Sequence, residues 1–205
     1  MNKKIILLAG NIGSGKTTLS NLLGEWFGWQ IGHESVADNP YLPDFYADMA
    51  RWGFHLQMYF LGHRAEQYLA LATSPNSVIL DRSIYEDATI FARGLHQMGD
   101  LKDRDYAAYR QLYSLIIRGL PRPDLLIYLD APVPFLLERI AQRGRAIEAG
   151  ISGDYLAMLN GFYHDWIAHF DDCPVLTIHS QDVDALNNAQ HLDFIAAQVT
   201  QKLGG

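Results

Sequence analysis

A phosphate-loop pattern near the start of the chain constrains the fold more than any other feature. The stretch GNIGSGKTT (10–18) follows the apolar run KKIILLAG (3–10) and precedes a helix-like segment. It fits G-x-x-x-x-G-K-[ST], in which a strand, a glycine-rich turn and a helix N-terminus surround phosphate oxygens with backbone N–H groups. Lys16 is expected to reach the β- and γ-phosphates, and the Thr17 hydroxyl to ligate Mg²⁺. The residues expected to hold the nucleotide are Gly10, Asn11, Ile12, Gly13, Ser14, Gly15, Lys16, Thr17 and Thr18.

The rest of the chain repeats the alternation of strand-like and helix-like segments. Further short apolar segments lie at 29–34, 77–83, 124–131 and 174–180. Several are apolar on consecutive residues, which is typical of parallel strands buried on both faces. Helix-like segments lie between and after them, at 16–27, 40–74 with a break, 85–119 with a break, 132–145, 153–170 and 184–203. The alternation predicts an α/β fold: a doubly wound, five-stranded parallel sheet flanked by helices, in one domain spanning 1–205.

Composition excludes several classes of function. The 205 residues carry a net charge of −7, whereas a nucleic-acid binder normally has a basic face, so no polynucleotide partner is expected. The N-terminal apolar run is short and leads directly into the phosphate loop, and no stretch reaches the roughly 20 apolar residues of a membrane helix. The one cysteine excludes an intrachain disulfide and the usual zinc sites. A soluble cytoplasmic protein is expected.

Charged residues are expected where the strands end, which is the edge at which parallel α/β sheets bind ligands. Glu34 ends the second strand, where its carboxylate would accept a proton from an attacking hydroxyl or simply open a surface loop. Asp81 ends the third strand, in the position of a Mg²⁺-organising carboxylate. Arg82, which follows it, would bridge the transferring phosphate and a carboxylate, or form a plain salt bridge.

Polar residues within apolar helical segments are a second group of candidates. Gln57 and Arg64 are seven residues apart, which places them on one face of a helix. Apolar neighbours surround Gln57, so its amide is either tied to backbone or reads the edge of a nucleobase. Asp87 and Phe91, four residues apart, would add a carboxylate and an aromatic wall.

Arginines gather near the end of the helix-like segment 132–145. Arg139 and Arg143 are four residues apart, and Arg145 follows Gly144. Guanidinium groups in this arrangement would close over a triphosphate and stabilise charge during phosphoryl transfer. The alternative is a solvated basic face, because acidic residues lie nearby.

In combination these motifs resemble the deoxyribonucleoside kinase family, and the short form resembles its bacterial deoxyadenosine/deoxyguanosine kinase branch. The resemblance covers most of the chain, from Ile5 to about Ile178. Its ordered motifs are GNIGSGKTT, ES ending the second strand, RWGFHLQMYFLGHR, DRSIYED and ERIAQRGRAIEAGI. The implied fold is a P-loop kinase with a small Arg-rich lid at about 139–150.

The resemblance implies a reaction and a role for each matching residue. ATP with Mg²⁺ would phosphorylate the 5′-hydroxyl of a deoxyribonucleoside, and the protein would be a homodimer. Glu34 would be the general base, held by Arg82, while Asp81 and Thr17 would organise Mg²⁺ and Asp81 would be a rival base. The remaining residues would bind substrates: Tyr46 and Glu148 the 3′-hydroxyl, Gln57, Arg64 and Asp87 the base edge, Leu42, Leu56 and Phe91 the base faces, and Lys16, Arg139, Arg143 and Arg145 the triphosphate. A loop near Gln181 and Asp182 would touch the adenine of ATP.

The sequence departs from the family pattern at two positions. Ser35 follows the strand-two Glu, where many members have proline, and Asp81 stands where several animal members have glutamate. Neither change removes a functional group that the reaction needs. The charged pair of Arg64 and Asp87 resembles kinases that accept deoxyadenosine, deoxyguanosine or deoxycytidine, so a purine deoxyribonucleoside is expected, deoxyadenosine first.

Two other readings of the phosphate loop remain. A nucleoside monophosphate kinase, such as a thymidylate kinase, would need cationic residues around the acceptor phosphate. The expected acceptor site instead contains Tyr46, Gln57 and Glu148, and a carboxylate repels phosphate. A nucleotide-dependent switch would bind ATP or GTP without an acceptor raising turnover. A GTPase of this kind would show an N-K-x-D-type motif, and the sequence has none.

Overall fold

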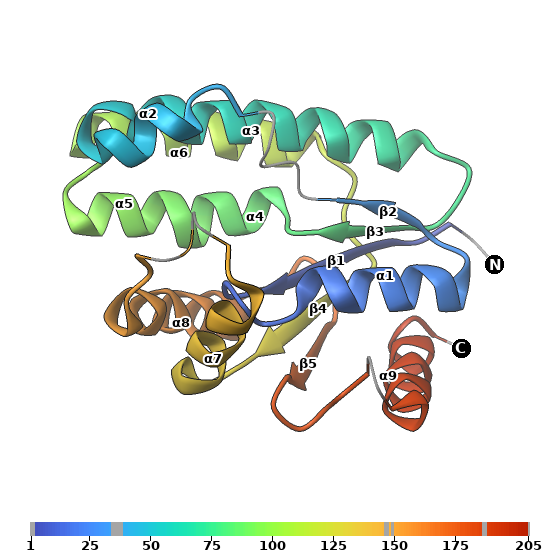
Figure 1. Cartoon of the computed structure of the whole chain (residues 1–205). Helices are drawn as coiled ribbons and strands as arrows, with labels where there is room; N and C mark the ends of the chain where they lie inside the picture. Colours follow the sequence, from blue (N-terminus) through green and yellow to red (C-terminus); the bar gives the residue numbers. More distant parts are fainter. Residues whose placement is uncertain (1–2, 34–38, 146–147, 149, 186–187, 205) are drawn as a thin grey trace. The chain divides into compact units, whose positions relative to one another are not determined.

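The computed structural model describes residues 3–33, 39–145, 148, 150–185 and 188–204. The chain divides into two compact units (Figure 1). We call the first the sheet unit, which comprises 1–33, 74–82 and 122–205. The second is the helical unit, which comprises 34–73 and 83–121.

The sheet unit is built on five parallel strands in the order β2-β3-β1-β4-β5. The strands are β1 (Ile5–Gly10), β2 (Gln30–Gly32), β3 (Val78–Asp81), β4 (Leu125–Asp130) and β5 (Val175–His179). All six residues of β1 are buried, as expected for a central parallel strand covered on both faces. Each strand falls within a segment predicted from the sequence, so the predicted five-stranded parallel sheet is confirmed.

Helices cover both faces of this sheet. The helices of the unit are α1 (Lys16–Phe27), α7 (Val133–Arg143), α8 (Gly153–Ala168) and α9 (Ala189–Lys202). Apolar residues of α1 and α9, such as Leu23 and Val199, share one core with Ile127 and Leu129 of β4. Tyr128 points to the opposite face, where its ring stacks on Tyr163 of α8. The doubly wound arrangement predicted from the sequence is therefore present.

The helical unit consists of consecutive helices that pack on one another. They are α2 (Leu42–Ala47), α3 (Met49–Thr73), α4 (Ile84–Glu86), the π-helix η1 (Asp87–Ala92), α5 (Arg93–Met98) and α6 (Asp103–Gly119). Gly53 of α3 faces α5, where a Cβ would make an ordinary van der Waals contact of 3.6 Å with a Leu95 methyl group. The predicted breaks within 40–74 and 85–119 are confirmed, whereas the π-helical turn was not predicted.

No helix in the described part of the chain is both long and apolar enough to cross a membrane.

The last helix begins at Ala189, five residues later than the sequence pattern predicted. Its start is set by Asn188, whose side chain accepts a hydrogen bond from the Gln190 N–H. An Asn at the N-cap satisfies a backbone donor that the helix itself leaves unpaired.

Candidate functional site

The phosphate loop joins β1 to α1 and depends on its glycines. Gly13 and Gly15 have φ of +85° and +97°, a backbone region that side chains with a Cβ rarely adopt. A Cβ on Gly10 would lie 2.8 Å from the carbonyl oxygen of Leu129, so this position has no space for one. The loop conformation therefore requires glycine where the motif has it. Its backbone leads into the N-terminus of α1, which favours anions.

Two side chains of the motif make hydrogen bonds at the phosphate loop. The Lys16 ammonium donates to the carbonyl oxygens of Gly10 (2.7 Å) and Asn11 (2.9 Å) and is almost fully buried. The Thr17 hydroxyl donates to Asp81 Oδ2 at 2.6 Å, so the two predicted Mg²⁺ ligands are side by side. Asp81 Oδ1 is buried and has no hydrogen-bond partner among the described residues. A hydroxyl beside a carboxylate with a spare oxygen suits a hard cation such as Mg²⁺.

Arg82 has an unusual, left-handed backbone conformation. Its φ of +75° makes it the one described residue other than glycine with a positive φ. A left-handed conformation at a residue with a Cβ costs on the order of 1–3 kcal/mol and is concentrated at functional sites. The Arg82 N–H donates to the Leu8 carbonyl oxygen at 3.2 Å, which anchors the turn to β1. In the helical unit, Ser83 and Glu86 form a capping box that starts α4 immediately afterwards.

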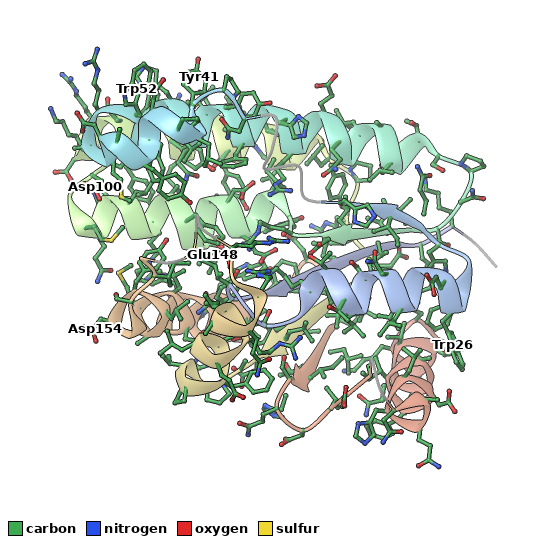
Figure 2. The ribbon with its side chains drawn as sticks, in the orientation of Figure 1. Trp26, Tyr41, Trp52, Asp100, Glu148 and Asp154 are labelled. Atoms are coloured by element: carbon green, nitrogen blue, oxygen red, sulfur yellow. The ribbon has the colours of Figure 1, made fainter. Side chains whose placement is uncertain are left out.

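The predicted lid arginines fall into two groups. Arg139 stacks its guanidinium over the Phe135 ring at 5.6 Å and lies beside Gly15 of the phosphate loop. Arg143 donates two hydrogen bonds to Glu148, one of them from Nε at 3.1 Å, and Arg145 lies 3.8 Å from the same carboxylate. Glu148 lies on the connection between α7 and α8 (Figure 2). The structure thus pairs Glu148 with the lid arginines.

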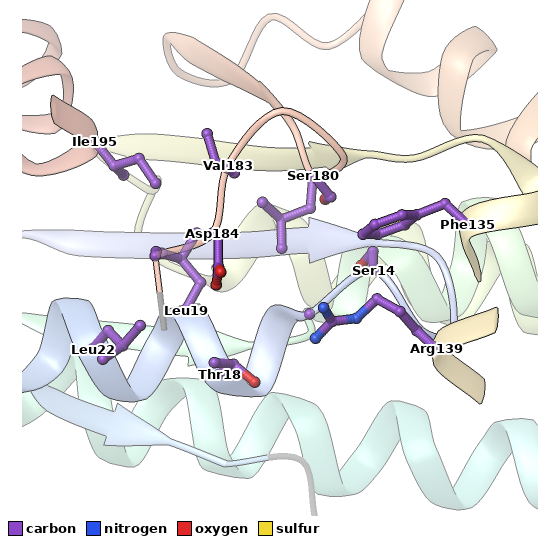
Figure 3. Close-up of a pocket in the computed structure, with 13 residues that line it drawn as sticks. Ser14, Thr18, Leu19, Leu22, Phe135, Arg139, Ser180, Val183, Asp184 and Ile195 are labelled. Carbon is purple, nitrogen blue, oxygen red and sulfur yellow. The ribbon is translucent and has the colours of Figure 1, made fainter. Parts of the chain in front are cut away.

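An open pocket adjoins the phosphate loop (Figure 3). The hydroxyls of Ser14 and Ser180 are buried at its wall and have no hydrogen-bond partner among the described residues. The remaining lining residues come from α1, the end of β4, α7, the loop after β5 and α9: Gly15, Thr18, Leu19, Leu22, Leu129, Phe135, Arg139, Val183, Asp184, Ala185 and Ile195.

The sequence predicted only part of this pocket. Arg139 and the phosphate-loop residues were expected there. The loop after β5 was expected to contribute near Gln181 and Asp182, whereas Ser180 and 183–185 line the pocket instead. Phe135 was missed, although its position four residues before Arg139 on one helical face was a usable signal.

Asp130, at the end of β4, is bound by two histidines. His164 Nε2 lies 3.1 Å from one carboxylate oxygen and His179 Nδ1 lies 3.2 Å from the other. Burial raises the pKa of Asp130, but the hydrogen bond and charge of His164, the charge of His179 and the Tyr128 hydroxyl together lower it below its usual value. In the described residues no group of three or more His, Cys, Asp or Glu could hold a metal ion. The cluster is thus a set of polar contacts centred on the Asp130 carboxylate.

In the helical unit, the polar residues predicted on α3 are buried. Gln57 and Arg64 are each 3% exposed and lie on the same face, as the spacing predicted. Arg64 Nε donates to Asp87 Oδ2 at 2.9 Å, and the Arg64 guanidinium lies 5.8 Å from the Phe60 ring centroid. Gln57 Oε1 is buried without a hydrogen-bond partner among the described residues. A buried polar atom of this kind costs free energy unless a ligand or water satisfies it.

The π-helical turn η1 carries Asp87 and Phe91, the two residues expected beside the base. Asp87 also acts on Tyr109 of α6: burial above all, and then the charge of Asp87, raises the pKa of that hydroxyl well above its usual value. Tyr109 is fully buried and was not predicted from the sequence as part of this group. π-Helical turns are frequent at functional sites, because they displace side chains from the regular helical register.

The other predicted acceptor residues all belong to the helical unit, apart from Glu148. Leu42 is the first residue of α2, and Leu56 is buried on α3. The Tyr46 side chain on α2 is half exposed, and Phe91 is partly buried. Glu34, the predicted general base, lies outside the described residues.

The arrangement of the sheet unit defines a class of protein. A five-stranded parallel sheet carries a phosphate loop with a buried lysine, a threonine–aspartate pair at the neighbouring strand end and an arginine against the loop. These are the parts that P-loop enzymes use to position and neutralise a nucleoside triphosphate during phosphoryl transfer. The class is that of the P-loop phosphotransferases.

Comparison with known proteins narrows the class to a family. The family model described as deoxynucleoside kinase matches residues 6–203, so the chain belongs to the deoxynucleoside kinase family and is a kinase. A deoxyadenosine/deoxycytidine kinase of Bacillus subtilis (strain 168) is 39% identical over 197 residues, which are 95% of this chain and 91% of that protein. A deoxyadenosine kinase of Dictyostelium discoideum is 40% identical, over 90% of this chain and 76% of that protein.

A solved structure supports the same assignment. The deoxyadenosine kinase from M. mycoides with bound dCTP superimposes with a TM-score of 0.83 at 26% identity. The match covers 96% of this chain and 99% of that chain. The family and the P-loop kinase fold expected from the motifs are thereby confirmed.

Proposed function

We propose that this kinase transfers the γ-phosphoryl group of ATP to the 5′-hydroxyl of a deoxyribonucleoside, with deoxyadenosine preferred over deoxyguanosine and deoxycytidine. The observation that carries the class of acceptor is Gln57, whose buried amide has an oxygen without a partner among the described residues. An amide can exchange a donor and an acceptor with the edge of a nucleobase. The names of the relatives, among them deoxyadenosine/deoxycytidine kinase and deoxyadenosine kinase, support the same acceptors.

The sheet unit is proposed to hold the donor. The loop from Gly10 to Thr18 would surround the phosphates, with Lys16 moving from its carbonyl partners to the β- and γ-phosphate oxygens. The pocket beside it would take the base and sugar of ATP, with Arg139 and Phe135 forming one wall. Thr17 and Asp81 would hold Mg²⁺, which neutralises charge on the phosphates when bound.

The helical unit is proposed to supply most of the acceptor contacts. Gln57 and the ion pair of Arg64 and Asp87 would read the base edge, while Leu42, Leu56 and Phe91 would pack on the base and Tyr46 would bind the 3′-hydroxyl. Glu34 would take the proton from the 5′-hydroxyl, and Arg82 would hold Glu34 and the transferring group. The contact of Asp81 with Thr17 supports a metal-binding role for Asp81 rather than that of general base.

Glu148 has two proposed partners. It would accept a hydrogen bond from the 3′-hydroxyl, as family members with this motif suggest. Its bonds to Arg143 would keep the lid segment 139–150 together while the triphosphate binds. The two roles are compatible, because a carboxylate has about four lone-pair sites.

The proposed function is tested by ADP formation from Mg·ATP with deoxyadenosine, deoxyguanosine, deoxycytidine and thymidine offered separately. We expect strong stimulation by deoxyadenosine, weaker stimulation by deoxyguanosine and deoxycytidine, and little by thymidine. Stimulation by thymidine alone would overturn the role given to Arg64 and Asp87. Stimulation only by a nucleoside monophosphate would overturn the choice of acceptor.

We further propose that the two units act as one kinase domain that forms a homodimer in the cytoplasm. On α6, Leu112 and Leu115 are 41% and 54% exposed, and Leu69 of the adjacent α3 is 46% exposed. We propose that these side chains, on two helices that contact each other, take part in the dimer interface. The dimer is tested by the molar mass in solution of the wild type and of Leu115→Glu, which is expected to be monomeric. One cysteine and no intrachain disulfide suit a reducing compartment.

A further inference from the structure

Helix α8 is hydrogen-bonded to the phosphate loop along one face. The Asn11 side-chain amide donates to the Leu156 carbonyl oxygen at 3.0 Å and to Asn160 Oδ1 at 2.7 Å. The Tyr163 hydroxyl donates to the Gly10 carbonyl oxygen at 2.8 Å. Positions 156, 160 and 163 follow the i, i+4, i+7 spacing of one helical face. No motif of the family resemblance includes these α8 residues.

The Tyr163 hydroxyl is held firmly in place. Its side chain is fully buried, and its ring stacks on Tyr128 with a centroid distance of 5.7 Å and packs against Trp166 at 6.3 Å. A trans peptide is planar, with its C=O and N–H pointing in opposite directions. By fixing the Gly10 carbonyl, the Tyr163 hydroxyl therefore also fixes the direction of the Asn11 N–H, where the loop leaves β1.

The Asn11 side chain is likewise committed to the loop scaffold. Its Oδ1 accepts from the Ile12 N–H at 2.7 Å, while its Nδ2 makes the two bonds to α8. Asn160 in turn donates from Nδ2 to the Ala131 carbonyl oxygen at 2.9 Å. The first turn of the phosphate loop is thus connected through Asn160 to the residue that follows β4. This connection leaves the Asn11 amide no capacity for a ligand beyond one lone pair.

Lys16 shares an acceptor with Tyr163. Its ammonium and the Tyr163 hydroxyl both donate to the Gly10 carbonyl oxygen, at 2.7 and 2.8 Å. A lysine that turns to the β- and γ-phosphates gives up that bond. The Gly10 carbonyl then keeps the hydrogen bond from the Tyr163 hydroxyl, which continues to hold its direction.

We propose that Tyr163 and Asn160 are positioning residues for the phosphoryl donor. They hold the backbone of Gly10 and Asn11, so that Lys16 can exchange its carbonyl partners for phosphate oxygens while the loop keeps its shape. Neither residue touches the donor. This inference rests on the proposed binding of ATP at the phosphate loop.

The structure supplies a matched pair of variants. Tyr163→Phe removes the hydroxyl that binds Gly10 and keeps the ring in its stack. Tyr128→Phe removes the hydroxyl of the other ring in the same stack, which donates to Asp130 at 3.3 Å. Without donor, Lys16 still satisfies the Gly10 carbonyl in Tyr163→Phe. With donor bound, that carbonyl loses the hydrogen bonds from both Lys16 and Tyr163, so the defect should appear on donor binding.

We expect the Kd for Mg·ADP, measured by calorimetry, and the KM for ATP to rise about fivefold in Tyr163→Phe, the effect of one neutral hydrogen bond. The KM for the deoxyribonucleoside should change less than twofold. The melting temperature without nucleotide should match that of Tyr128→Phe, and that control should keep the wild-type Kd for Mg·ADP. Asn160→Ala, which removes two hydrogen bonds, should raise the Kd further.

Two results would overturn the inference. One is a Kd for Mg·ADP that is equal in the wild type and Tyr163→Phe. The other is a lower melting temperature in Tyr163→Phe with equal rises in the KM of both substrates, which is the signature of a general packing defect. A wild type that binds Mg·ADP but forms no ADP with any deoxyribonucleoside would instead refute the proposed function, and the calorimetric comparison would still decide the role of Tyr163.

Discussion

The buried ion pair of Arg64 and Asp87 allows stability and substrate choice to be tested separately. The two side chains are 2% and 5% exposed, and Nε lies 2.9 Å from Oδ2. Transfer of each charge from water costs several kcal/mol, and their mutual attraction offsets this cost only while both are present. We therefore expect Arg64→Met or Asp87→Leu alone to lower the free energy of unfolding by about 3–5 kcal/mol.

The double variant removes both charges at once. Because apolar side chains of similar volume replace the pair, its free energy of unfolding should return close to that of the wild type. For a chain of this length each kcal/mol shifts the melting temperature by about 2–4 °C, so the single variants should melt roughly 6–20 °C below the wild type. Urea denaturation of the four proteins gives the coupling free energy between the two residues.

Additive losses, with a coupling below about 0.5 kcal/mol, would refute this account of the pair's stability. The same double variant tests function, because it should be folded. Loss of a hydrogen bond to a charged group weakens binding by about 1.5–3 kcal/mol, so the ratio of kcat/KM for deoxyadenosine over thymidine should fall roughly 10- to 100-fold. A wild-type ratio in the folded double variant would remove Arg64 and Asp87 from base selection.

Three further predictions concern single groups. Glu34→Gln should lower kcat by about 10²-fold with little change in nucleoside binding. Asp81→Asn should mainly raise the Mg²⁺ concentration needed for half-maximal rate. The opposite pattern would make Asp81 the general base and Glu34 the metal ligand. Burial, followed by the charges of Asp172 and Asp124, raises the pKa of Cys173 to about 12. The thiol should therefore react with a thiol reagent at pH 8 about 10³-fold more slowly in the folded protein than after unfolding, and equal rates would contradict this. The pKa of Asp130 in the native state is lower than its usual value of 3.8, so the ionised carboxylate stabilises the fold at pH values above 3.8. This stabilisation is lost as the pH falls through the lower pKa of the native state. The melting temperatures of Asp130→Asn and the wild type should therefore differ at pH 6 and converge toward pH 3.

The strands and the phosphate loop could be predicted because their signals are local. Runs such as IILLAG and LLIYLD are apolar on consecutive residues, and the structure buries every residue of β1. The glycines of the motif likewise have local causes, since φ and close approach at Gly10, Gly13 and Gly15 exclude a Cβ. Asp81 was expected at the ligand edge because parallel strands end at one edge, and the family resemblance implied its partnership with Thr17.

The contacts of α8 with the phosphate loop could not be predicted from the sequence. Asn160 meets Asn11 across 149 positions, and Tyr163 meets Gly10 across 153. In the stretch LAMLNGFYHDWI, the sequence pattern shows only that the tyrosine lies on the buried face of a helix. It gives no indication that the hydroxyl has a specific hydrogen-bond partner. The π-helical turn at Asp87–Ala92 was also missed, because nothing in its residue types indicates the extra residue per turn.

The charge of the chain shows how an acidic protein can hold a triphosphate. A net charge of −7 opposes a polyanion that would contact the whole surface, but screening limits such effects to about 8–10 Å at ordinary ionic strength. Within that range the phosphate loop has Lys16 and the adjacent Arg139. The lid segment 139–150 holds three arginines and one glutamate, Glu148, so its pairing with Arg143 leaves an excess of positive charge. An acidic composition and a local arrangement that favours a small phosphate ligand are therefore compatible, because the two properties act over different distances.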